Sequence, residues 1–138
     1  MKGHFVSVTG NSMYPAILPD DRVFIEQKDK YDVGDILVFN YQSEQCLIHR
    51  LLFCANNCYY CKGDNSFRIE GVTYQSILGK VKFILRRENI ILPENMSSEF
   101  IRRSLKVGLN FYRAGNNRDE IINSTAYIEY KQHYNGGK

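Results

Sequence analysis

Hydrophobic and polar positions along the first two thirds of the chain predict a series of short strands separated by polar turns. β-branched and aromatic residues fill short runs, and Pro, Gly, Asp and Asn mark the breaks between them. This pattern predicts a mainly β fold of antiparallel strands. The runs predicted as strands are residues 5–8, 22–26, 36–39, 46–54, 59–62 and 77–85, with a polar excursion at 67–76.

The last third of the chain has a different pattern. Apolar residues recur near helical spacing over residues 98–113, and Ser97 or Ser98 can cap a helix there. Its other surface is basic, which fits either solvent exposure or contact with an anionic membrane surface. The tail from residue 116 has one apolar patch, at 127–130. We therefore expect residues 93–138 to form a helical extension packed on or beside the β domain.

A β-hairpin is predicted between residues 46 and 62, with Asn56 and Asn57 as its two-residue loop, because asparagine tolerates a positive φ. In that register, facing residues have numbers that sum to 113, so His49 lies directly opposite Asp64. Directly opposed side chains point to the same face of a sheet, with Cβ atoms roughly 4.5–5.5 Å apart. The hairpin therefore predicts that the imidazole and the carboxylate meet. A slip of one residue would remove this contact.

Ser12 lies in a bend between Gly10 and Pro15, shortly after the predicted strand 5–8. Pro15 has a fixed φ and no N–H donor, and it favours extended geometry for the residue before it. The Ser12 hydroxyl is therefore expected to project from the bend, near backbone N–H groups that no strand uses. A serine nucleophile with an oxyanion hole needs this arrangement. A polar turn before a proline is the alternative interpretation.

Ser12, His49 and Asp64 have compatible chemical roles. A serine hydroxyl is a weak nucleophile at neutral pH and needs a base within hydrogen-bond reach. An unperturbed imidazole titrates at about pH 6.5, which suits that task, and a facing carboxylate fixes its tautomer. Taken singly, His49 also fits a half-buried strand position and Asp64 a turn position.

Composition and charge bear on whether the protein binds nucleic acid, spans a membrane or forms disulfides. The chain has 138 residues, enough for one domain with a core, and its formal net charge of +3 gives no argument for nucleic acid. No apolar run approaches the roughly 20 residues that a membrane helix needs, and little chain precedes Ser12, so no anchor or signal peptide is expected. Four cysteines without a secretory segment indicate a reducing, cytoplasmic setting with free thiols.

The cysteine spacing leaves metal binding open as an alternative. Cys54, Cys58 and Cys61 match the spacing of the iron–sulfur site in radical enzymes that use S-adenosylmethionine, but those enzymes need a barrel larger than this chain. Cys46 would complete a four-thiolate zinc site. Small buried or half-exposed thiols are the simpler interpretation, so we expect no metal and no cofactor.

Several motifs resemble, in the same order, those of the type I signal peptidases and the LexA-type self-cleaving repressors. Ser12 lies in a Ser-Met-x-Pro box. The later segments resemble the family's Asp-x-Val strand, Gly-Asp-Ile-Val strand, general-base strand, Lys-Gly-Asp-Asn segment and Gly-Lys-Val strand. The resemblance covers about residues 5–85. Its motifs are residues 10–18, 21–25, 33–39, 47–52, 62–66 and 78–81.

The resemblance implies a partly open antiparallel β-barrel of signal-peptidase/LexA-like type with a C-terminal helix, and residues 1–92 as the catalytic domain. It implies Ser12 as nucleophile, His49 as general base and Asp64 as the assisting carboxylate. Most bacterial relatives use a lysine base, so His49 resembles the endoplasmic-reticulum-type branch, in which histidine replaces lysine. Arg50 is excluded as the base because a guanidinium does not deprotonate in proteins.

The Ser-Met-x-Pro box implies further site residues. Many signal peptidases have a serine two positions before the nucleophile that helps to line the oxyanion hole, and here that position is Gly10. The hole would then be formed by the backbone of Ser12, with Asn11 and Gly10 beside it. Met13 and Pro15 are expected to contact the substrate.

The resemblance implies a serine endopeptidase that cuts leader or signal-like peptides, with small residues favoured just before the cut. Because no anchor is visible, the leader of a modified and exported peptide is one expected substrate. Association with a transporter or a membrane surface is a further expectation. The alternative is a non-catalytic peptide-binding module of the same fold. Self-cleavage, as in the repressors, is disfavoured because no cleavage loop is visible before Ser12.

Overall fold

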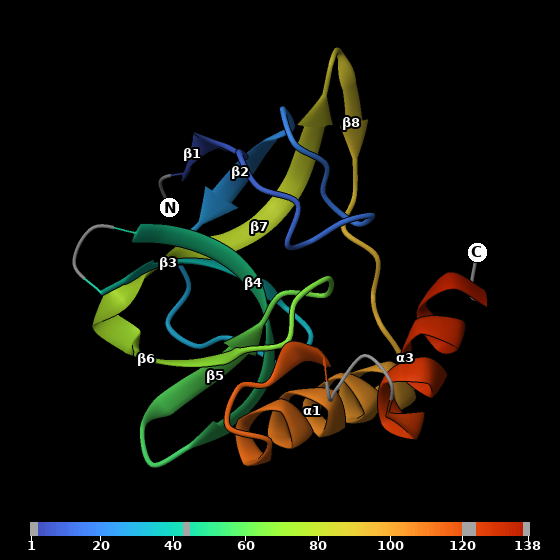
Figure 1. Ribbon diagram of the computed structural model, residues 1–138. Coiled ribbons are helices and arrows are strands. Elements are labelled where there is room, and N and C mark those ends of the chain that lie inside the picture. Colours follow the sequence, from blue (N-terminus) through green and yellow to red (C-terminus); the bar gives the residue numbers. More distant parts are fainter. Residues whose placement is uncertain (1–2, 43–44, 120–123, 137–138) are drawn as a thin grey trace.

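A computed structural model describes residues 3–42, 45–119 and 124–136. Its core is one sheet of eight antiparallel strands in the order β1-β2-β7-β3-β4-β5-β6, with β8 paired to β7 (Figure 1). Within the described ranges β1 and β6 do not pair with each other, so the curled sheet stays open. The predicted mainly β, partly open fold is confirmed. The strands are β1 Gly3–Ser7, β2 Arg22–Glu26, β3 Ile36–Tyr41, β4 Gln45–Ala55, β5 Cys58–Lys62, β6 Ile69–Thr73, β7 Ile77–Arg86 and β8 Asn89–Ile91.

The central strand β3 shows why its sequence is a continuous apolar run. Its side chains alternate between two hydrophobic clusters, because successive residues of a strand point to opposite faces. Ile36 and Val38 pack with the residues that follow β1, among them Ile17. Leu37 and Phe39 pack on the other face. Both faces of the strand are therefore buried, and no polar alternation remains in its first four residues.

Two C-terminal helices, α1 (Ser98–Arg113) and α3 (Thr125–Gly136), pack against each other, and α1 contacts β4, β5 and β6 (Figure 1). The predicted helix 98–113 is confirmed. α3 lies within the helical extension expected at residues 93–138 but was not predicted as a separate helix, because its sequence has almost no amphipathic pattern. A third hydrophobic cluster joins the helices to the sheet, and its buried members are Leu52, Phe100, Ile101, Val107 and Tyr130.

The basic residues of α1 are partly neutralised by neighbours. Arg102 and Arg103 both form ion pairs with Glu99, at 2.6 and 2.7 Å, and Arg103 also pairs with Glu129. Across the described ranges, no helix has both the length and the apolar character needed to cross a bilayer. Contact with a membrane surface stays a prediction.

β6 corrects the expectation that residues 67–76 form a polar excursion. Glu70 and Val72 point inward and are buried, whereas Gly71 and Thr73 point outward. Since a carboxylate occupies an inward position, the segment lacks the apolar alternation by which strands are recognised.

The β4–β5 hairpin has the predicted loop but a different register beyond it. Asn56 and Asn57 form the loop with φ of 53° and 63°. The pairing follows the predicted sum of 113 from the loop to Phe53, and then shifts by one residue between Leu51 and Phe53, so that Leu52 is the extra residue of a β-bulge. The prediction that His49 lies opposite Asp64 is therefore wrong.

Replacing Ser97 tests which serine caps α1. The Ser97 side chain accepts a hydrogen bond from the N–H of Phe100 at 3.1 Å, whereas Ser98 is already the first helical residue and is exposed. We expect Ser97→Ala to lower the free energy of unfolding by about 1 kcal/mol, measured by urea denaturation, because a helix N–H loses its acceptor. Ser98→Ala is the matched control and should change it by less than about 0.5 kcal/mol. Equal effects of the two variants would contradict this assignment of the cap.

Candidate active site

Ser12 and His49 meet where the turn after β1 approaches β4. Ser12 lies in the turn that follows β1, and its side chain is half-buried. His49 lies on β4 and is 4% exposed, with its ring edge against the ring of Phe39. The distance from Ser12 Oγ to His49 Nε2 is 3.1 Å. The hydroxyl therefore has a base within hydrogen-bond reach.

Glu70 on β6 is the carboxylate that contacts His49. Its Oε1 lies 2.7 Å from His49 Nδ1, and its side chain is 2% exposed. A carboxylate only accepts hydrogen bonds, so Nδ1 donates and Nε2 is left to accept from the Ser12 hydroxyl. The other oxygen, Oε2, receives a longer contact of 3.4 Å from Arg68 Nε. The three residues form a continuous chain of polar contacts: Ser12, His49 and Glu70.

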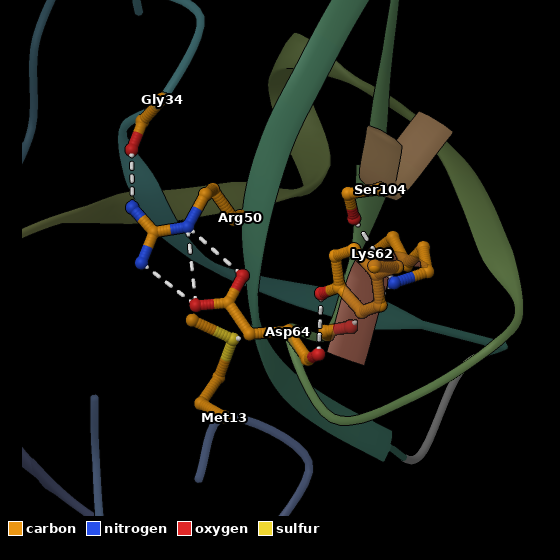
Figure 2. A network of polar contacts seen from close by, with 8 residues as sticks. Met13, Gly34, Arg50, Lys62, Asp64 and Ser104 are labelled. Carbon is orange, nitrogen blue, oxygen red and sulfur yellow. Dashed lines mark hydrogen bonds and ion pairs between the residues drawn. The ribbon is translucent and has the colours of Figure 1, made fainter. Parts of the chain in front are cut away.

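Asp64 does not contact His49, which corrects the sequence-based expectation. Its carboxylate instead forms a two-pronged ion pair with Arg50, at 2.9 Å to Nε and 2.8 Å to Nη2, and both side chains are fully buried (Figure 2). Arg50 also donates to the carbonyl of Gly34 at 2.9 Å. The physical reason is the bulge at Leu52, which shifts the register so that Asp64 lies one position away from the predicted pairing.

The other residues expected in the site have separate positions. Met13 is buried, and its sulfur accepts a hydrogen bond from the N–H of Asp64 at 3.3 Å. Pro15 is half-buried, whereas Gly10 and Asn11 are exposed. In the described part of the chain, the backbone N–H of Ser12 donates to no protein acceptor.

Two cavities flank Ser12. One, of about 380 Å³, lies between the end of β1 and the start of β4. The other, of about 490 Å³, lies toward β6 and the end of α1. Ser12 and Leu47 border both cavities. A bound peptide that extends from one cavity into the other would therefore pass the Ser12 hydroxyl. The first is also bordered by Val6–Gly10, Met13, Ile17, Cys46 and Ile48, and the second by His49, Ser66–Arg68, Glu70, Phe111 and Asn116.

The cysteines are free thiols in different places. Cys61 is buried in the core, Cys58 is half-buried, and Cys46 and Cys54 are exposed. Burial raises the pKa of Cys61. Among the described residues, no three His, Cys, Asp or Glu side chains converge in a way that could hold a metal ion. The structure therefore adds no support for the iron–sulfur or zinc alternatives.

Lys62 is a buried charged residue behind the site, at the end of β5. Its side chain is fully buried, and this burial lowers its pKa to about 7, although the carboxylates of Asp64 and Glu70 act in the opposite direction. Lys131 on α3 adds a smaller lowering. Its amine donates to the side chain of Ser104 at 3.0 Å, so Lys62 is held away from Ser12 by a different partner.

Comparison with known proteins shows the family of the chain. A family model described as Peptidase S24-like matches residues 2–82, more than half of the chain, and this span contains Ser12, His49 and Glu70. The chain belongs to the Peptidase S24-like family. No curated protein matches it.

Membership of the Peptidase S24-like family supports a serine-peptidase type of function in general terms. The matched span covers the sheet up to β7 and ends before α1 and α3 begin. The helices that pack against the sheet therefore lie outside the part of the chain that defines the family.

Sequence reasoning missed Glu70 because its strand was not recognised. A weak signal was present: Ile69, Gly71 and Thr73 alternate with Glu70 and Val72, which is a strand period with one carboxylate on the inner face. A single acidic residue inside such a segment is a candidate partner for a buried histidine elsewhere.

Replacing Asp64 tests its structural role. Asp64→Asn should lower the free energy of unfolding by about 3–5 kcal/mol, because it leaves the buried guanidinium of Arg50 without a counter-charge. Urea denaturation measures the effect. Glu26→Gln is the control, because the Glu26–Lys82 ion pair is 3.7 Å long and its lysine is half-exposed. This variant should lower the free energy of unfolding by less than about 1 kcal/mol. Similar costs for the two variants would contradict the assignment.

Lys62 should make stability depend on pH. The amine keeps its proton in the unfolded chain up to about pH 10.5 but loses it in the folded protein above about pH 7, so the folded state gains stability as pH rises between these values. Relative to Lys62→Met, we expect wild type to gain about 2 kcal/mol from about pH 7 to about pH 9, measured by urea denaturation. The control Lys82→Met, at a half-exposed site, should show no such trend. A difference between wild type and Lys62→Met that stays constant with pH would contradict the prediction.

Proposed function

We propose that the chain is a serine endopeptidase in which Ser12 is the nucleophile, His49 the general base and Glu70 the carboxylate that orients His49. The observation that carries the proposal is the continuous chain of contacts Ser12–His49–Glu70, at 3.1 and 2.7 Å, in a Peptidase S24-like chain. Glu70 takes the assisting role that the sequence suggested for Asp64. The histidine base is the feature shared with the endoplasmic-reticulum-type signal peptidases.

The contacts support the following order of proton transfers in the proposed reaction. As Ser12 Oγ bonds to the carbonyl carbon of the scissile peptide, its proton passes to His49 Nε2. Glu70 accepts the Nδ1 hydrogen bond throughout and stabilises the imidazolium that forms. The imidazolium then protonates the leaving amine, which departs as the C–N bond breaks. In the second half, His49 takes a proton from water as the hydroxide bonds to the acyl carbon. The bond between that carbon and Ser12 Oγ then breaks, the carboxylic acid product leaves, and the imidazolium returns its proton to Oγ.

The negative charge that forms on the carbonyl oxygen of the scissile peptide needs hydrogen-bond donors to stabilise it. The Ser12 N–H suits this role because no protein acceptor occupies it within the described residues. Gly10 has open space around its α-carbon, and Asn11 is exposed, so both can lie beside the oxyanion. These residues form the proposed oxyanion hole together with the turn that carries Ser12.

An extended peptide fits the edge of β4. Residues 46–49 pair with β3 on one side, whereas pairing with β5 begins only at Arg50, so their other edge has no partner strand in the described part of the chain. That edge borders the cavity of about 380 Å³ beside Ser12. A substrate strand added there would lead its scissile bond to the hydroxyl. Met13, which lines this cavity, would contact a small side chain next to the cut.

The proposed substrate class is a leader-like peptide segment in extended conformation. The support is the open strand edge and the small, largely apolar lining beside it, together with the resemblance of the Ser-Met-x-Pro box to that of signal peptidases. The leader of a modified and exported peptide is a proposed example. A folded protein would not reach Ser12 without presenting an unpaired strand.

Three variants test the proposed chemistry. Ser12→Ala and His49→Ala should each lower the rate of peptide cleavage by about 10⁴-fold or more, because nucleophile and base act as one unit. Glu70→Gln should lower it by about 10²–10⁴-fold, since the amide favours the wrong tautomer of His49. The measurement is mass spectrometry of peptides encoded beside the gene after incubation with each protein.

Matched controls use the same residue types away from the site. Ser98→Ala and His4→Ala change exposed residues and should cleave at the wild-type rate. The alternative function, a peptide-binding module, makes a different prediction: wild type binds the peptide without cutting it, and Ser12→Ala changes nothing. Binding without any cleavage by wild type would overturn the peptidase proposal.

A further inference from the structure

Residues 63–66, in the loop between β5 and β6, lie against both members of the Ser12–His49 pair. The Asn65 N–H donates to the Ser12 carbonyl at 2.7 Å, and the Asn65 side chain donates to the Asn11 carbonyl at 3.1 Å. A Cβ on Gly63 would lie 2.6 Å from the Ser12 carbonyl oxygen and 3.0 Å from His49 Nε2. The loop backbone therefore fills the space directly behind the two side chains.

The C-terminal helices hold the same loop from its other side. The Tyr130 hydroxyl on α3 donates to the Asp64 carbonyl at 2.6 Å. Lys62 donates to the Gly63 carbonyl at 3.2 Å and to Ser104 of α1 at 3.0 Å, as the Lys62–Ser104 contact in Figure 2 shows. The Lys62 amine also lies 4.6 Å from the centre of the Tyr130 ring. Two consecutive loop carbonyls are thus bound by groups that the helices supply or position.

These polar groups are buried, so their geometry is constrained. Lys62 and Ser104 have no exposed surface, and Tyr130 is 1% exposed. A buried polar group that loses its partner costs free energy, so the loop has few alternative positions while the helices are packed. From the Tyr130 hydroxyl, the path to the nucleophile is short: Asp64 accepts from Tyr130, and its neighbour Asn65 donates to Ser12.

We propose that Tyr130 and Lys62 are positioning residues for the Ser12–His49 pair, through which α1 and α3 fix the loop 63–66 against the nucleophile. The inference deepens the proposed peptidase function and rests on it. It assigns a role in the reaction to helices that lie outside the Peptidase S24-like match at residues 2–82.

Apolar packing alone would give the helices a simpler role. The Tyr130 ring packs on the ring of Phe100, 5.4 Å away, within the cluster that joins the helices to the sheet. That role needs the ring but not the hydroxyl. Tyr130→Phe keeps the ring and removes the hydroxyl that donates to the Asp64 carbonyl, so it separates positioning from packing.

The test measures the reactivity of Ser12 with a fluorophosphonate probe. The probe's phosphorus bonds to Ser12 Oγ, fluoride leaves, and the serine proton passes to His49. We expect Tyr130→Phe to lower the maximal rate of labelling by about 10-fold or more, with the half-saturating probe concentration unchanged, because misplacing the nucleophile slows chemistry rather than binding. Ser104→Ala removes the hydroxyl that accepts from Lys62, and it should also lower the maximal rate of labelling.

Controls separate positioning from loss of fold. Tyr127→Phe, on the same helix, should label at the wild-type rate, and all variants should be folded by circular dichroism at the assay temperature. Wild-type labelling by both Tyr130→Phe and Ser104→Ala would overturn the positioning role. So would a fall in rate that Tyr127→Phe shares to the same extent.

Hydrogen exchange tests the loop independently of catalysis. In Tyr130→Phe, the amide of Asn65 should exchange about 10-fold faster than in wild type, whereas amides of the central strand β3 should not change. If wild type neither labels nor cleaves, the proposed function fails, and this exchange still decides whether Tyr130 fixes the loop 63–66. Unchanged exchange at Asn65 would overturn the inference, and faster exchange would support it.

Discussion

Between β4 and β5 the strands pair in one register near their loop and in another beyond Leu52, the extra residue of a β-bulge. The site depends on this shift. His49 and Arg50 are neighbours on β4, so they point to opposite faces of the sheet, and each needs a buried carboxylate. With the bulge, Arg50 meets Asp64 and His49 meets Glu70. A regular hairpin would bring His49 opposite Asp64 instead, and two buried acids would compete for one imidazole.

The bulge also connects the sheet to the helices. In a regular strand, the residues on either side of a given position share a face. Here Leu51 packs in the cluster that contains Leu37 and Phe39. Leu52 and Phe53 both pack in the cluster that joins the helices to the sheet. Two successive apolar side chains therefore point toward α1 and α3, and the helices cover the place where regular pairing fails. The same helices contact the loop 63–66 through Tyr130 and Ser104. They therefore pack over both the bulge and the loop that lies against Ser12.

How far the sequence predicts this structure depends on whether each element has a local signal. The run 36–39, the loop at Asn56 and Asn57, and the helix 98–113 all have one, and each is where it was expected. The pairing of Ser12 with His49 followed from chemistry and motif order, and the structure brings the two together. The bulge has no local signal, because Leu52 is one apolar residue in an apolar run. Glu70 was missed because a charged residue on the inner face hides the strand that carries it.

Lys62 lies near the site as a second basic side chain, and the structure shows why His49 and not Lys62 contacts Ser12. Lys62 has the property that a lysine base requires, since burial lowers its pKa to about 7. Its amine, however, bonds to Ser104 and the Gly63 carbonyl and faces the helices, whereas the imidazole of His49 reaches Ser12. A neutral imidazole can be buried at a lower cost than an ammonium group, and Glu70 satisfies its second nitrogen. The two residues therefore have separate positions: the histidine contacts the Ser12 hydroxyl, and the buried lysine bonds to α1 and to the loop behind Ser12.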